Sequence, residues 1–320
     1  MTDLEPCVLT DPSSSLAATF VPGAGMIGTS LCDDGVELLG QRRGITAYVA
    51  EHKTMGIPLL YPWANRLSGN DYQVGATQAT LTPGFGGVHA DEHGAPIHGT
   101  LAGDAGWRVS ARSPSALTAE LDFGARPDLL ATFPFPHLLE LAITLADRTL
   151  TVRTTVTATG DTVVPLCFGF HPYLQLPGAP RSQWLIETPT MRSRIVDAHN
   201  IPTGALEPHP ASAELLGDKV FDHGFDEVAP GAVFAVSGGG RRVEVRFDQG
   251  YPAAQIYAPA AEAVVCFEPM AAPTDALRRG GYAVARLGQP GVAEFSLRVT
   301  HPPGSPTPRE QTQNRTSAAV

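Results

Sequence analysis

The residue best suited to acid–base chemistry in this sequence is Glu268, which stands directly after an apolar run. Residues 263–267 carry no charged side chain, which is typical of a strand buried on both faces. A carboxylate at the end of such a strand costs free energy unless it is paired, exposed or used in function. Desolvation would raise its pKa toward the range of a general base. Glu268 is therefore the first candidate catalytic residue.

Two histidines offer groups that can transfer protons near neutral pH. His171 follows an apolar segment and precedes Pro172, so we expect it where a strand leaves its sheet. A hydrogen-bonded histidine with a purely structural role fits the same position. His98 precedes Gly99 and is the better single candidate among the histidines of residues 89–98.

Residues 89–98 also raise the question of a metal site, because they hold three histidines and two acidic residues. The HExxH pattern of zinc hydrolases is absent, and the neighbouring glycine and proline do not favour a helix that would align ligands. Metal binding is therefore the weaker interpretation of this segment.

Two further polar residues stand among turn-forming residues. Arg66 lies in residues 56–69, and its guanidinium offers five donors in a fixed geometry that suits hydroxyl or carboxylate groups. An arginine alone is more often part of a surface ion pair. Asp222 lies in residues 221–226, which predict a loop that either presents this carboxylate or forms an Asx-type turn.

Alternating apolar residues predict that strands position these side chains. Residues 139–145 and 150–156 alternate around a short turn, which predicts a hairpin with one buried face. The pattern recurs at residues 243–247 and 295–299. The 33 glycines and 29 prolines agree with many short strands joined by tight turns. The expected fold class is all-β.

The chain shows no internal repeat and no linker, so one large β domain is expected over residues 1–300. Helical periodicity is confined to residues 212–220 and 274–279, where one or two turns are expected. Residues 301–320 are rich in Pro, Ser, Thr, Gln and Asn, which predicts a disordered tail.

Charge and cysteine usage restrict the partners. The formal net charge is −10 and no basic patch is present, which argues against nucleic acid. Four widely spaced cysteines without a CxxC pair fit the reduced thiols of a cytoplasmic protein. Residues 1–6 lack the features of a signal peptide, and no apolar run approaches the ~20 residues of a membrane helix. We expect a cytoplasmic monomer or homodimer that binds a small molecule and no membrane.

Taken in order, five segments resemble motifs of the aldose 1-epimerase (galactose mutarotase-like) family. They are PWANRLSG at residues 62–69, His98-Gly99 with Trp107, GFHPYL at residues 169–174, FDHGF at residues 221–225 and FEPM at residues 267–270. Residues 202–204 and 256–259 match weaker family features. The resemblance implies a large antiparallel β-sandwich with few short helices and a sugar cleft across the concave face of one sheet.

The resemblance also implies roles in mutarotation of a free aldose such as glucose or galactose. Glu268 resembles the general base that takes the proton of the C1 hydroxyl. His171 resembles the general acid that protonates the ring oxygen, so that the ring opens and closes again as the other anomer. The expected substrate-binding residues are Arg66, His98, Asp222, Asn65 and Tyr257. The implied mechanism requires no metal or organic cofactor, so we expect none.

Three alternatives stay open at this point. A hexose-6-phosphate 1-epimerase would need an added phosphate clamp, for which Arg42, Arg43 or Arg192 are candidates if the fold brings them near. A non-catalytic sugar-binding protein could use the same fold. A glycoside hydrolase uses two carboxyl groups, and Asp222 with Glu268 could form that pair.

Overall fold

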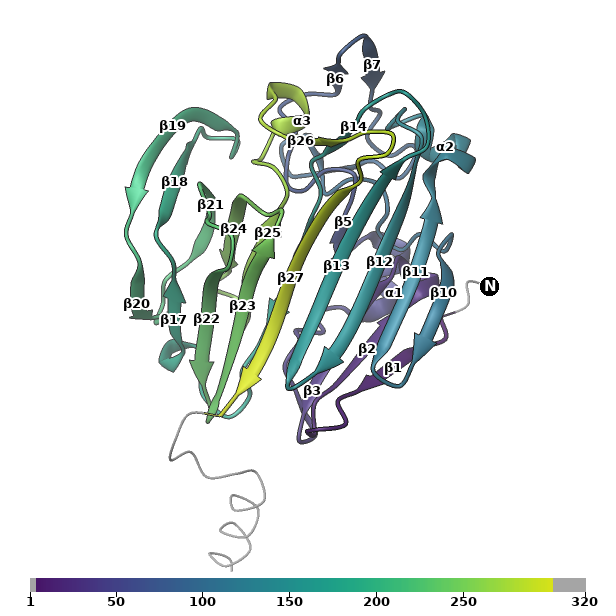
Figure 1. Ribbon diagram of the computed structural model, residues 1–320. Helices are drawn as coiled ribbons and strands as arrows, with labels where there is room; N and C mark the ends of the chain where they lie inside the picture. The colour runs from purple at the N-terminus through teal and green to yellow at the C-terminus, as the bar shows by residue number, and fades with distance from the viewer. Residues whose placement is uncertain (1–3, 302–320) are drawn as a thin grey trace, which may run out of the picture.

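Two large antiparallel sheets packed face to face dominate the computed structural model, which describes residues 4–301 (Figure 1). The alternating segments predicted the all-β class, and the family resemblance implied the sandwich. The predicted tail, residues 301–320, lies outside the described residues except for His301. Within residues 4–301, no helix has the length and apolar character of a membrane span.

The first sheet has nine strands within the described residues, and it contains the predicted hairpin. β12 (His137–Ala146) and β13 (Thr149–Ala158) pair over their full length around the turn at residues 147–148. Alternate side chains of both strands are buried, as their period of two predicts. The other strands are β10 (Arg108–Ser113), β11 (Ala116–Asp122), β27 (Gly291–Thr300), β23 (Arg241–Gln249), β22 (Ala232–Gly238), β17 (Leu185–Thr188) and β20 (Ser212–Leu215).

The second sheet has eight strands within the described residues and carries most of the candidate site. All six residues of its strand β25 (Val265–Met270) are buried, as predicted for a strand covered on both faces. Its other strands are β19 (Pro202–His209), β18 (Met191–Val196), β21 (Phe221–Asp226), β24 (Ala253–Ala258), β15 (Gly169–Phe170), β16 (Tyr173–Leu174) and β5 (Leu59–Leu60).

Aromatic side chains join the two sheets in one core. Phe234 of β22 lies 5.5 Å from Phe267 of β25 between ring centroids, and Phe295 of β27 lies 4.9 Å from Phe170 of β15. All four rings are buried. Such ring pairs add specific contacts to the apolar area that the sandwich buries. The nine-stranded sheet therefore forms the support against which the site-bearing sheet packs.

Smaller elements cover the edges of the sandwich. They are a four-stranded sheet of β1 (Cys7–Thr10), β2 (Ala17–Val21), β3 (Ile27–Asp33) and β4 (Val36–Glu37), the pairs β6 (Asp71–Val74) with β7 (Thr77–Thr80), β8 (His89–Ala90) with β9 (Pro96–Ile97) and β14 (Val164–Leu166) with β26 (Ala283–Ala285), and the helices α1 (Gly44–Glu51), α2 (Pro127–Leu130) and α3 (Ala276–Arg279). Three single 3₁₀ turns complete the set: Pro22–Ala24, Phe123–Ala125 and Arg181–Gln183.

One of the two expected helical segments is confirmed. α3 forms within residues 274–279, but residues 212–215 are strand β20 and the helix expected at residues 212–220 is wrong. β20 pairs with β17 from Leu185↔Leu215 to Thr188↔Ser212, so pairing with a strand from elsewhere in the chain overrides a weak local periodicity. Helix α1 was not predicted from the sequence.

Candidate active site

The centre of the site is a buried contact between a carboxylate and an imidazole. Glu268 Oε1 lies 3.1 Å from His171 Nε2, and the two residues are 2% and 5% exposed. The sequence predicted Glu268 at the end of a strand. This prediction is wrong, because β25 continues to Met270. The Glu268 side chain is therefore held in the middle of the sheet.

Strand register places the two residues opposite each other. The strands β15 and β16 both pair with β25, through Gly169↔Met270 and Tyr173↔Cys266. His171 lies between β15 and β16, and the same register leaves it opposite Glu268. Backbone pairing on both sides of His171 thus fixes the Glu268–His171 contact.

Burial shifts both titrations toward the uncharged forms. Burial raises the pKa of Glu268 well above its usual 4.5, with a further rise from Asp222 and an opposing effect of Arg66. Burial lowers the pKa of His171 well below its usual 6.5, and His98 and Arg42 lower it further. The pair therefore favours a state with one proton between the two side chains over states with two or none.

Tyr173 belongs to the same centre and was not predicted as a site residue. Its hydroxyl lies 3.2 Å from His171 Nε2 and 2.6 Å from Thr54 Oγ1, and it accepts a hydrogen bond of 3.0 Å from Arg42 Nη1. Its ring is stacked on the imidazole. The available signal was its position two residues after His171, which places both side chains on one face of the chain.

Asn65 and Arg66 lie beside His98 because two tight segments meet there. Asn65 and His98 both adopt left-handed backbone conformations, with φ of 56° and 62°. The His98 backbone N–H donates to Asn65 O at 3.0 Å, and the Asn65 side-chain oxygen accepts from the backbone and the guanidinium of Arg66. These contacts hold the two motif segments together.

The acidic residues of segment 89–98 fix Arg66. Arg66 Nε donates to Asp91 Oδ2 at 2.7 Å, and Asp91 also accepts hydrogen bonds from the backbone of His93 and Ala95. Arg66 Nη2 lies 3.5 Å from Glu92. The acid-rich composition that raised the metal question therefore serves to orient a buried guanidinium.

His98 is a neutral imidazole with a free nitrogen. Burial, helped by Arg66, lowers its pKa to about 3. Its Nδ1 is buried and has no hydrogen-bond partner among residues 4–301. Its ring meets that of His171 edge-on, with centroids 5.9 Å apart. Such a nitrogen is available to a hydroxyl of a ligand.

Asp222 and Tyr257 approach the centre from β21 and β24. The predicted loop around Asp222 is wrong, since residues 221–226 form β21 and pair along β24. Gln255 of β24 lies opposite Glu268 and donates from Nε2 to Asp222 Oδ1 at 2.6 Å. The ring of Tyr257 meets His171 edge-on at 5.6 Å.

Gln255 was not predicted as a site residue from the sequence. Its signal was its position two residues before Tyr257, on the same face of the strand. Together with Asn65, Arg66 and Asp222 it lines one crevice. The structure therefore brings the five predicted substrate-binding residues around the Glu268–His171 contact.

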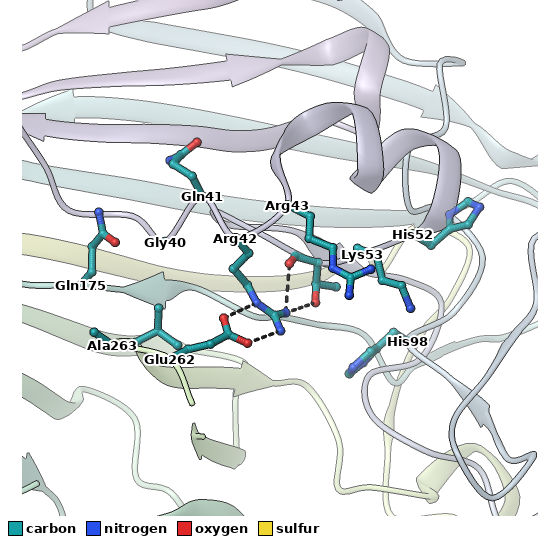
Figure 2. A pocket seen from close by; sticks show the side chains of 12 residues that line it. Gly40, Gln41, Arg42, Arg43, His52, Lys53, His98, Gln175, Glu262 and Ala263 are labelled. Atoms are coloured by element: carbon teal, nitrogen blue, oxygen red, sulfur yellow. Dashed lines mark hydrogen bonds and ion pairs between the residues drawn. The ribbon is translucent and has the colours of Figure 1, made fainter. Parts of the chain in front are cut away.

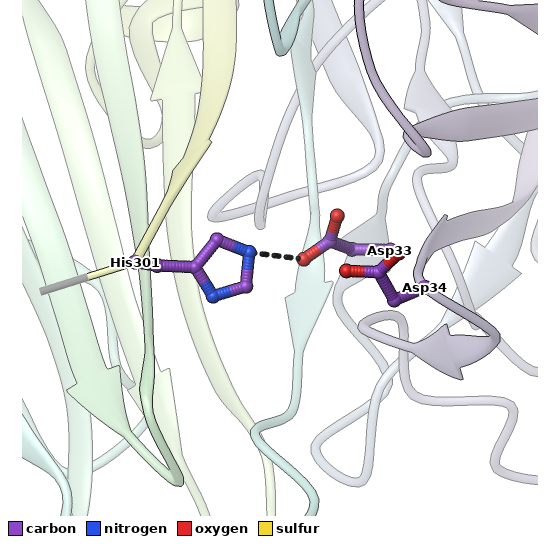
Figure 3. A group of neighbouring side chains, drawn as sticks. All are labelled: Asp33, Asp34 and His301. Carbon is purple, nitrogen blue, oxygen red and sulfur yellow. Dashed lines mark ion pairs between the residues drawn. The ribbon is translucent and has the colours of Figure 1, made fainter. Parts of the chain in front are cut away.

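The described residues contain one group with metal-ligand geometry, and it lies outside segment 89–98. It consists of Asp33, Asp34 and His301 (Figure 3). Asp33 already contacts His301 Nε2 at 3.0 Å and the guanidinium groups of Arg148 and Arg241 at 2.7 and 3.2 Å. Because cationic donors surround this carboxylate, we interpret the group as an ion-pair network.

The histidines of segment 89–98 point toward different neighbours. His89 stacks on His52 at 3.8 Å, and His93 meets His199 edge-on at 5.0 Å. His98 faces His171. The three imidazoles of this segment therefore do not converge on one point, as ligands of a single metal ion would.

Comparison with known proteins assigns the family of this chain. The sequence profile of the aldose 1-epimerase family matches residues 13–285, so the chain belongs to that family. The match begins well before residue 56, where the resemblance of motifs starts. A search of curated protein sequences finds no match.

Several solved structures share the fold. The Slr1438 protein of Synechocystis sp. PCC 6803 superposes with a TM-score of 0.73 at 20% identity, covering 93% of this chain and 96% of that one. The GalM/aldose epimerase homologue from C. elegans gives 0.75 at 18%, covering 93% and 99%. A galactose mutarotase-like protein from Clostridium acetobutylicum gives 0.75 at 15%, covering 94% and 100%. These superpositions establish the sandwich fold. At such low identity they do not establish the activity, which has to be argued from the residues of the site.

Proposed function

We propose that this protein is an aldose 1-epimerase that interconverts the α and β anomers of a free hexose. The observation that carries the proposal is the buried contact of 3.1 Å between Glu268 and His171. A carboxylate and an imidazole in one water-poor site provide a base and an acid that can act in the same step. Membership of the aldose 1-epimerase family supports this choice.

In the proposed reaction Glu268 takes the proton from the C1 hydroxyl while His171 gives a proton to the ring oxygen. The C1–O5 bond breaks, and the electron pair on O1 forms the aldehyde C=O. Rotation about C1–C2 presents the other face of the aldehyde to the O5 hydroxyl. Ring closure reverses both transfers. The O5 hydroxyl gives its proton back to His171, and Glu268 gives its proton back to O1. Each positioned group contributes roughly 10²–10⁴-fold to such a reaction.

The proton inventory of the pair suits this mechanism. The reaction needs one proton on the pair, carried by the imidazole while the carboxylate is charged. Without a bound sugar, burial favours the uncharged form of the pair, in which the same single proton lies on Glu268 and the His171 imidazole is neutral. Arg66 lowers the pKa of Glu268 and so favours the carboxylate form that accepts the C1 proton.

The surrounding residues suit recognition of sugar hydroxyls. The unpaired Nδ1 of His98 can bond a hydroxyl, and Asp222, held by Gln255, keeps acceptor capacity on its carboxylate. Arg66 and Asn65 present donors and acceptors to the same crevice. The Tyr257 ring offers an apolar face for the C–H groups of a sugar. No metal or organic cofactor takes part in this proposal.

A cytoplasmic location is part of the proposal. All four cysteines are unpaired, and three of them are buried. Free thiols of this kind are typical of proteins that stay in a reducing compartment.

Polarimetry of freshly dissolved α-D-glucose and α-D-galactose tests the proposed activity. The proposal predicts that catalytic amounts of protein accelerate the approach to the equilibrium rotation of at least one sugar. Sugar binding without acceleration would indicate a binding protein on this fold. Release of sugar from an aryl glycoside would indicate a glycoside hydrolase.

A further inference from the structure

A second feature of the molecule is a large cavity next to the acid–base pair. It has a volume of about 700 Å³ and is lined in part by Arg42, Arg43, Lys53 and Glu262 (Figure 2). We refer to it as the cationic cavity. Volumes of this order are typical of small-molecule sites.

The cationic cavity reaches the catalytic centre through two of its lining residues. One is His98, whose ring lies edge-on to His171. The other is Thr54, whose hydroxyl contacts Tyr173 at 2.6 Å. A ligand that reacts at His171 could therefore extend a substituent into this cavity.

Positive charge in the cavity exceeds negative charge. Glu262 accepts two hydrogen bonds of 2.8 Å from Arg42 and is neutralised by that guanidinium. Lys53 forms no ion pair with the described residues, and burial lowers the pKa of the neighbouring His52 so that it stays neutral.

Arg43 is also free to bind a ligand. Its only ion pair among the described residues is a contact of 3.8 Å to Glu51, and both side chains are more than half exposed. Exposed pairs of this kind contribute little. Figure 2 shows Arg43, Lys53 and His98 around the same space.

We propose that the cationic cavity binds an anionic group, a phosphate or a carboxylate, that the sugar substrate carries away from C1. The inference rests on the proposed epimerase function and replaces the free hexose proposed above with an anionic sugar as the preferred substrate. A guanidinium fork and an ammonium point charge form the usual pair for such oxyanions. The chain carries a net charge of −10, so these two unneutralised cations are a local feature and not part of a generally basic surface.

Anomerisation of glucose, glucose 6-phosphate and glucuronate, followed by polarimetry, tests the proposal. Charge-assisted contacts predict that kcat/KM for at least one anionic sugar exceeds that for glucose by about 10- to 100-fold. A higher kcat/KM for glucose 6-phosphate than for glucuronate would indicate a phosphate site, and the reverse order would indicate a carboxylate site. The advantage should shrink as salt increases.

Arg43→Gln and Lys53→Gln test the assignment to the cavity. Each variant should raise KM for the preferred anionic sugar about tenfold and leave the kinetics of glucose unchanged. Arg246→Gln is the matched control, because Arg246 is an exposed residue of β23 in the other sheet. Equal kcat/KM for all three sugars, with glucose turnover dependent on Glu268, would overturn the subsite and leave the epimerase intact.

A binding measurement separates the subsite from catalysis. Titration of Glu268→Gln with glucose 6-phosphate, glucuronate and glucose should show tighter binding of the preferred anionic sugar by about tenfold or more, lost when Lys53→Gln is added. This result would hold even if no sugar were epimerised. Equal affinity for all three sugars would contradict the subsite.

Discussion

The phenol ring of Tyr173 lies parallel to the imidazole of His171, with ring centroids 4.2 Å apart and planes inclined by 7°. The Tyr173 hydroxyl contacts His171 Nε2 and is itself held by Thr54 and Arg42. The stacked ring limits rotation of the imidazole, and the hydroxyl fixes the nitrogen that faces Glu268. Tyr173 therefore acts as a positioning residue for the proposed acid.

Tyr173→Phe tests this role, since it keeps the stacked ring and removes the hydroxyl. We expect kcat to fall about tenfold, because a misplaced proton donor slows a step that depends on geometry, while KM changes little. Thr54→Val should give a smaller loss in the same direction. A rise in KM with unchanged kcat would assign the hydroxyl to substrate binding instead.

The pH dependence of kcat/KM should be a broad bell. On the acid side the pair gains a second proton at His171, and burial displaces this step below the usual pKa of 6.5. On the alkaline side the pair loses its only proton from Glu268, whose pKa lies well above the usual 4.5. Activity should therefore be highest between these two displaced steps and fall at both ends. A profile with a single ionisation near either usual pKa would contradict a shared proton.

Gln255→Leu should weaken substrate binding. Gln255 is buried, and its amide holds the Asp222 carboxylate through a hydrogen bond of 2.6 Å. Without that bond the carboxylate loses its orientation, and we expect KM to rise about tenfold, equivalent to roughly 1.4 kcal/mol. Initial rates over a range of sugar concentration would measure the effect. A drop in kcat alone would indicate that Gln255 acts on Glu268.

His137 should make the fold sensitive to acid independently of the site. It is fully buried, its Nδ1–H donates to Phe135 O at 2.6 Å, and its Nε2 accepts from the Tyr61 hydroxyl at 2.5 Å. Burial lowers its pKa from 6.5 to about 4, so the neutral form stabilises the fold above pH 6.5. As pH falls, the unfolded chain gains this proton first, and the free energy of unfolding should drop by about 3 kcal/mol by pH 4.

His137→Phe removes that titration in a site of similar shape. At pH 7 the variant should be less stable by about 1–3 kcal/mol, because the Tyr61 hydroxyl is left unpaired in the core. Between pH 7 and pH 4 its stability should decline less steeply than that of the wild type. Urea unfolding at both pH values measures the difference, and parallel losses would show that His137 does not drive the acid sensitivity. Tyr61→Phe is the control that keeps the titrating histidine.

Local pattern was sufficient to predict one hairpin of the supporting sheet and the strand that carries the proposed base. The alternation of residues 139–156 predicted the hairpin, and the apolar run before Glu268 predicted a strand covered on both faces. His171 lies at a strand end, as its position before Pro172 indicated. These features depend on neighbours in sequence, which alternation and apolar runs describe directly.

Features that depend on pairing between distant strands were not predictable in this way. Residues 221–226 contain Gly, His and Asp and locally favour a loop, but the ladder with β24 makes them a strand. The role of Gln255 follows from the register of β21, β24 and β25. Thr54 and Tyr173 are 119 residues apart in sequence, and only the fold brings their hydroxyls into contact.

The most direct test of the account is the rate of α-D-glucose or α-D-galactose mutarotation by the Glu268→Gln variant, whose side chain keeps its size and loses its proton-accepting charge. Circular dichroism and thermal unfolding would establish that the variant is folded. The account predicts a loss of about 10²-fold or more in kcat with an unchanged fold. Turnover within a few-fold of the wild type would contradict Glu268 as the base and with it the proposed mechanism.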